Sequence, residues 1–173
     1  MPCRARPVAV LLVLGLAVSG CGYLIGPSHR VQVRTIAVPV FDSDTNRRGL
    51  GLRLTEAVHK EIQRRLPYRI VTGANADTRL TGKVLAAYKD VLGETNNDDP
   101  RSLQFQLAVE VIWTDLRTQE VLARQRVTDD DSSVRLMTHA EFSPEIGQSM
   151  ATASQQAIDR MARRIVDLLE APW

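Results

Sequence analysis

Cysteine is nearly absent from this sequence. Only Cys3 and Cys21 occur among the 173 residues, and both lie within the first 21 positions. A disulfide between them would close a short terminal loop and cross-link nothing else, so a disulfide framework is excluded. Zinc sites that are built mainly from cysteine thiolates are excluded for the same reason.

Patterns of catalytic and metal-binding residues are also lacking. The three histidines, His29, His59 and His139, are far apart, and none stands at metal-ligand spacing from another. The sequence contains neither a Gly-x-Ser-x-Gly elbow nor a phosphate-binding loop. We therefore expect a protein that is not an enzyme and that holds no metal and no dissociable cofactor.

A large excess of one charge is missing as well. Lysine and arginine together number 22, against 20 for aspartate and glutamate, which gives a net charge of +2. Dedicated nucleic-acid-binding domains carry a much larger basic excess, so no nucleic-acid partner is expected.

The N-terminal segment has the plan of an export signal. Arg4 and Arg6 precede the eleven residues Val8–Val18, which are all apolar or glycine, and small residues follow. This apolar run is too short for a membrane-spanning helix, which needs about 20 residues. A basic start, a short apolar core and small residues at the end predict a secretory signal peptide.

The sequence Val18-Ser19-Gly20-Cys21 resembles a bacterial lipobox. In such a signal the cysteine thiol is alkylated by a diacylglyceryl group, and cleavage then makes that cysteine the new N-terminus. Each buried methylene of the acyl chains contributes about 0.8 kcal/mol, so two or three chains anchor a protein firmly. Two alternatives remain open, namely an uncleaved membrane anchor with an incidental cysteine and a plain secreted protein.

This interpretation divides the chain into three parts. Residues 1–20 are the predicted lipoprotein signal peptide, residues 21–32 a lipidated tether, and residues 33–173 a single α/β domain. Loss of Arg4 and Arg6 with the signal leaves 20 basic against 20 acidic side chains. Gly22 follows the cysteine where Asp often retains lipoproteins in the inner membrane, which favours the outer membrane.

The first half of the predicted domain contains strands around one helix. The first strand is expected near Arg34–Phe41, because Thr35–Phe41 is β-branched and apolar, and Pro39 places this strand at an edge or close to its end. Leucine, valine and isoleucine then recur every four residues from Leu50 to Leu66, which predicts an amphipathic helix of about 17 residues. A short strand follows at Tyr68–Val71.

The second half reads as an antiparallel meander and a last helix. Strand alternation covers Leu80–Tyr88 and, most clearly, Leu103–Thr114. After a hairpin turn, Val121–Thr128 is expected to return as a strand, and the acidic run 129–131 to end the sheet. Ser143-Pro144-Glu145 has the residues of a helix start, and the apolar pattern predicts a helix that runs to Glu170.

These elements predict an α+β fold, a two-layer sandwich in the order β-α-β-β-β-α. Its sheet would be four-stranded, mixed but mostly antiparallel, with two helices on one face. The other face is semi-polar and is expected to meet water or a partner.

Basic residues on the predicted strands are candidate contacts to an anionic lipid or a partner, because cations attract anionic groups. They are Lys83, Lys89, Arg124 and Arg126. The alternative is that these side chains are simply solvated.

Several segments together resemble the LptE family of lipopolysaccharide-assembly lipoproteins. They are Cys21-Gly22-Tyr23, the strand 36–41 with sequence Ile-Ala-Val-Pro-Val-Phe, the helix segment 54–58, Ala76-Asp77 with Leu80 and Gly82, and Trp113-x-Asp115. The resemblance implies an outer-membrane lipoprotein without catalytic activity that binds lipopolysaccharide. It also implies a role as partner and plug of the β-barrel LptD, through which lipopolysaccharide reaches the cell surface.

The pattern Ala76-Asp77-x-x-Leu80-x-Gly82 also occurs in other periplasmic lipoproteins. An alternative is therefore a different interaction lipoprotein, such as a CsgG-like secretion subunit or an activator of a cell-wall synthase. The Cys-Gly-Tyr start and the Val-Pro-Val-Phe strand favour the LptE family.

Overall fold

The computed structural model describes residues 33–73, 75–94, 100–122 and 133–170. The predicted signal peptide and tether, including Cys21, lie outside these residues, as do Arg124, Arg126 and the acidic run 129–131.

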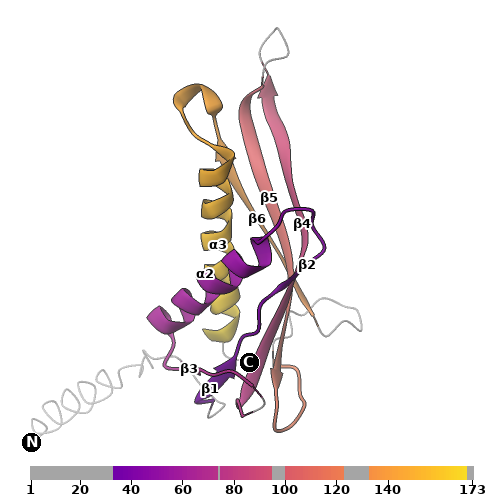
Figure 1. Ribbon diagram of the computed structural model, residues 1–173, viewed down its shortest axis with the longest axis vertical. Coiled ribbons are helices and arrows are strands. Elements are labelled where there is room, and N and C mark those ends of the chain that lie inside the picture. Colours follow the sequence, from indigo (N-terminus) through magenta and orange to yellow (C-terminus); the bar gives the residue numbers. More distant parts are fainter. Residues whose placement is uncertain (1–32, 74, 95–99, 123–132, 171–173) are drawn as a thin grey trace, which may run out of the picture.

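One mixed sheet forms the larger layer of the fold (Figure 1). Its strands are β1 (Thr35–Ala37), β2 (Asp42–Ser43), β3 (Arg69–Ile70), β4 (Thr78–Glu94), β5 (Pro100–Asp115) and β6 (Val134–Phe142). Their order is β3-β1-β4-β5-β6, and β2 lies beside β4. The pairs β4–β5 and β5–β6 are antiparallel, whereas the short strands pair in parallel.

Two helices, α2 (Leu50–Arg65) and α3 (Met150–Glu170), cover one face of the sheet, as predicted (Figure 1). The apolar residues of α2 that recur every four positions, among them Leu54, Val58 and Ile62, are fully buried. On β5 every second residue from Leu103 to Trp113 is buried, which confirms the predicted alternation. The core therefore lies between these helices and one face of the sheet.

The sheet has six strands rather than the predicted four, and Pro39 explains part of the difference. The expected strand Arg34–Phe41 is interrupted, because proline has no N–H to donate to a ladder. The chain leaves the sheet after β1, and the backbone N–H of Phe41 donates instead to Thr55 Oγ1 of α2 at 2.9 Å. It rejoins the sheet only at β2.

The predicted return strand Val121–Thr128 is not the partner of β5 along Leu103–Val111, where β6 takes that place. Val121 forms only an isolated bridge to Thr114, and residues 123–132 lie outside the described part of the chain. The strand that pairs with β5 is β6, from Leu103↔Phe142 to Val111↔Val134.

The alternation of β6 is hard to detect because its inward positions include Thr138 and an outward one holds Met137. Burial of the Thr138 hydroxyl is tolerated because it donates to the Ala157 carbonyl at 3.2 Å.

The last helix begins later than predicted. Ser143 precedes only a 3-10 turn, η1 (Pro144–Ile146), which Gly147 ends at a φ of 80°. Helix α3 then starts at Met150, so its 21 residues extend about 32 Å instead of the roughly 40 Å expected.

A β-bulge changes the phase of β4. The register shifts between Val84 and Ala86, so that Val84 faces the core and, further along, Ala87 does so too. Tyr88, predicted to share a face with Leu80, therefore lies on the opposite face and is exposed. The predicted single alternation from Leu80 to Tyr88 is wrong beyond the bulge.

Candidate functional site

The predicted basic contacts do not form one patch among the described residues. Lys83 lies opposite Glu110 and forms an ion pair with Asp44 at 2.8 Å. The hydrogen bond to the Asp44 carboxylate raises the pKa of Lys83. Lys89 lies beyond the bulge opposite Phe105 and is exposed, so these two lysines are on opposite faces of β4.

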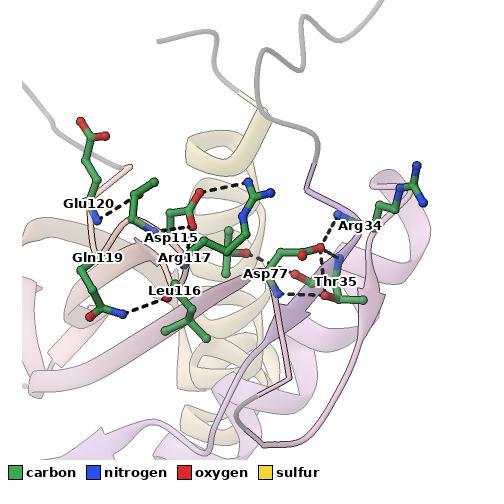
Figure 2. A network of polar contacts seen from close by, with 10 residues as sticks. Arg34, Thr35, Asp77, Asp115, Leu116, Arg117, Gln119 and Glu120 are labelled. Carbon is green, nitrogen blue, oxygen red and sulfur yellow. Dashed lines mark hydrogen bonds and ion pairs between the residues drawn. The ribbon is translucent and has the colours of Figure 1, made fainter.

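Asp77, from the Ala-Asp-x-x-Leu-x-Gly segment, accepts hydrogen bonds that connect distant parts of the chain (Figure 2). Its Oδ2 accepts hydrogen bonds from the backbone N–H groups of Arg34 and Thr35, both at 2.9 Å, and from the Thr35 hydroxyl at 3.0 Å. These bonds, led by that from Arg34, hold the pKa of Asp77 below its usual range. Asp77 thus fixes the start of the domain to the start of β4.

Asp115 performs a similar task at the end of β5 (Figure 2). Its Oδ1 accepts hydrogen bonds from the backbone N–H groups of Arg117 at 2.8 Å and Thr118 at 3.3 Å. Burial alone would raise the pKa of Asp115. Hydrogen bonds from Arg117 and Thr118 outweigh this effect, so the net result is a lowered pKa. The backbone N–H of Leu116 donates to the Asp77 carbonyl at 2.9 Å, which joins the two networks.

Two glycines leave room for Phe41. A Cβ at Gly51 would lie 2.1 Å from the Phe41 carbonyl oxygen, and one at Gly82 would lie 2.6 Å from the Phe41 ring. Both positions therefore require glycine for packing. The segments that carry the family resemblance thus have structural roles.

A basic pocket lies at the seam between α3 and β6, and we call it the arginine pocket. Its volume is about 330 Å³. It is lined by Arg65, Thr138, His139, Arg160, Arg163, Arg164 and Asp167. Four guanidinium groups and one carboxylate therefore share its wall.

Two of these arginines cover the edge of the sheet. Strand β6 is the last in the sheet order, so its outer edge has no strand partner among the described residues. Arg160 Nη1 donates to the His139 carbonyl at 2.6 Å, and Arg164 Nη1 donates to the Met137 carbonyl. Because free backbone groups at an edge invite pairing with another chain, these contacts also protect β6.

Arg65 brings the end of α2 to the same place. It pairs with Asp167 at 2.8 Å, with Glu61 at 3.5 Å and also with Glu170. The hydrogen bond to Glu170 is the main cause that raises the pKa of Arg65. This arginine is thereby neutralised by carboxylates and ties α2 to α3.

Sequence reasoning did not find the arginine pocket. Arg65 belongs to α2 and the other three arginines belong to α3, so no local pattern in the sequence links them. The available signal was the spacing of Arg160, Arg163, Arg164 and Asp167, which places them along one side of a helix.

No group of three or more His, Cys, Asp or Glu side chains within the described ranges could hold a metal ion. None of the described helices is long and apolar enough to cross a membrane.

Comparison with known proteins identifies the family. The family model of LptE, described as lipopolysaccharide-assembly, matches residues 33–171. The chain belongs to the LptE family. No curated protein sequence matches this LptE-family chain.

Solved structures share the fold of this LptE-family chain at low identity. The protein XCC0632 from Xanthomonas campestris has 12% identity and a TM-score of 0.56, over 80% of this chain and 84% of that one. Lipoprotein B from Nitrosomonas europaea has 10% identity and a TM-score of 0.53, over 82% and 84%. The rare lipoprotein B from Shewanella oneidensis has 10% identity and a TM-score of 0.50, over 79% and 93%.

Proposed function

We propose that this chain is an outer-membrane lipoprotein that binds lipopolysaccharide and acts as partner and plug of the LptD barrel in lipopolysaccharide transport. The observation that carries this proposal is the match to the LptE family over residues 33–171. The proposed anchor is a diacylglyceryl and acyl modification of Cys21, on the periplasmic side of the membrane or within the barrel lumen.

The shape of the domain supports a role as a plug. Strands β4 and β5, of 17 and 16 residues, form a hairpin of about 55 Å that extends past the helices (Figure 1). The helix-free face of the sheet includes Gln104, Gln106 and Glu110. The interior of outer-membrane barrels is polar, so a mixed polar face of this kind suits an occupant of the lumen.

Copurification tests the barrel partnership. The full-length chain with a C-terminal affinity tag, extracted from its own bacterium in mild detergent, should retain an outer-membrane barrel of much larger mass. Absence of a barrel would refute the partnership. A peptidoglycan synthase or a ring of this chain alone would instead favour the alternative interaction lipoprotein.

Metabolic labelling with a fatty acid tests the anchor. Wild-type protein and a Cys3→Ala control should incorporate the label, because the proposed thiol is intact in both. Cys21→Ala should lose it. Equal labelling of Cys21→Ala would show that this thiol carries no lipid.

A further inference from the structure

Three arginines of the arginine pocket have no acidic partner among the residues that the structure describes. Arg160, Arg163 and Arg164 form no ion pair with a carboxylate in the described part of the chain. Asp167, the one acidic residue of the wall, pairs with Arg65 from α2. The pocket therefore holds uncompensated positive charge beside the edge of the sheet.

Two of these guanidinium groups are held in place but keep most of their donors. Arg160 and Arg164 each direct Nη1 to a carbonyl of β6. A guanidinium has five N–H donors in a planar fork, so most of each fork stays available. Because the forks are anchored, less side-chain freedom is lost when they bind a ligand.

The spacing of the anchors suits a tetrahedral oxyanion. The two carbonyls belong to Met137 and His139, two residues apart on a strand and therefore about 7 Å apart. Charge-assisted N–H···O bonds of about 2.7–2.9 Å from both sides of that gap reach the oxygens of one phosphate group. The pocket volume of about 330 Å³ falls at the lower end of the range for small-molecule sites.

Arg163 supplies a third guanidinium to the same pocket. It lines the wall, is exposed, and makes no hydrogen bond or ion pair to any other residue within the described ranges. A side chain of this kind is free to close on a bound anion.

We propose that the arginine pocket binds a phosphate group, with Arg160 and Arg164 as fixed donors and Arg163 as the closing donor. The ligand is either free phosphate or the phosphomonoester headgroup of a lipid, since both present the same oxygens. Its biological meaning as a lipid site rests on the proposed function, but phosphate recognition itself needs neither barrel nor lipopolysaccharide.

Titration calorimetry of the purified full-length chain in non-ionic detergent tests this site. One arm uses inorganic phosphate, and the other uses mixed micelles that contain phosphatidic acid or, as a blank, phosphatidylcholine. Arg163→Gln is the test variant, because Arg163 makes no hydrogen bond or ion pair within the described ranges and its replacement should leave the fold intact. Arg79→Gln is the matched control, because Arg79 is exposed on β4 opposite Thr114, on the helix-free face.

Wild type and Arg79→Gln should bind with equal affinity, and Arg163→Gln at least about tenfold more weakly, as loss of a charge-assisted bond requires. Binding of inorganic phosphate would identify the free anion as sufficient, and binding only of phosphatidic acid would identify the lipid headgroup. Absence of binding in both arms would overturn the proposal. It would also be overturned if Arg79→Gln lost as much affinity as Arg163→Gln. Neither result would bear on copurification with a barrel.

Discussion

Asp77 and Thr35 bind each other reciprocally across 42 positions of sequence. The Thr35 hydroxyl donates to Asp77 Oδ2 at 3.0 Å, and the backbone N–H of Asp77 donates to Thr35 Oγ1 at 2.9 Å. The same carboxylate oxygen also accepts the backbone N–H of Thr35 at 2.9 Å. The first strand of the domain is thereby fixed to the turn that precedes β4.

Asp77→Asn should destabilise the fold by about 1–2 kcal/mol, because neutral acceptors form weaker hydrogen bonds than a carboxylate does. Urea unfolding of the purified protein at pH 7 measures this difference. Asp42→Asn is the matched control, since Asp42 is exposed on β2, and it should leave the midpoint nearly unchanged. Equal midpoints for the two variants would contradict the structural role of Asp77.

Acid should weaken the fold through the same carboxylate. The pKa of Asp77 is lower in the folded chain than its ordinary value near 3.9. Its contribution is therefore fully present above the unfolded pKa and is lost as the pH falls through the folded pKa. The free energy of unfolding, measured from pH 6 to pH 2.5, should fall less steeply below about pH 4 in Asp77→Asn than in wild type. If the free energies of unfolding of the two proteins fell in parallel with pH, Asp77 would not be the cause of the acid effect.

Gly51→Ala should destabilise the protein by about 3 kcal/mol or more, although alanine usually favours a helix by about 1 kcal/mol over glycine. The reason is the 2.1 Å approach of the new Cβ to the Phe41 carbonyl oxygen, which is backbone and cannot rotate away. Gly82→Ala should cost less, because its neighbour is the Phe41 ring.

Thermal unfolding of both variants provides the measurement. Gly93→Ala serves as control, since its nearest atom would be Ser102 Cβ at 4.0 Å. A stabilised Gly51→Ala protein would show that α2 does not contact Phe41 as described.

Gln119→Gly should stabilise the turn after β5 by about 0.5–1 kcal/mol. Gln119 has a φ of 59°, a left-handed conformation that costs a non-glycine residue about 1–2 kcal/mol. The greater freedom of glycine in the unfolded chain offsets part of that gain. Gln119→Ala keeps the backbone strain and is the control. Equal midpoints of urea unfolding for the two variants would show that glycine relieves no strain at this position.

The arginine pocket shows why candidate sites were harder to predict than elements. Arg65 and Arg160 are 95 positions apart and meet only because α2 and α3 pack side by side. Conversely, Lys83 and Lys89 are six positions apart, which a regular strand would place on one face, but the bulge after Val84 places them on opposite faces. The bulge lies in the run Val84–Ala87, where every residue is apolar, so the sequence contains no change in polarity that would mark the shift.

The sequence by itself determined the elements whose signals are local. Helix α2 was predicted from Leu50 to Leu66 and is observed to Arg65, because a four-residue apolar period and Pro67 define it within one segment. The alternation of β5 was equally clear. Only the tertiary structure decided that β6, and not Val121–Thr128, pairs with β5 along Leu103–Val111. Its inward Thr138 is stabilised by a carbonyl of α3, and a contact with a distant helix leaves no periodic signal along the strand.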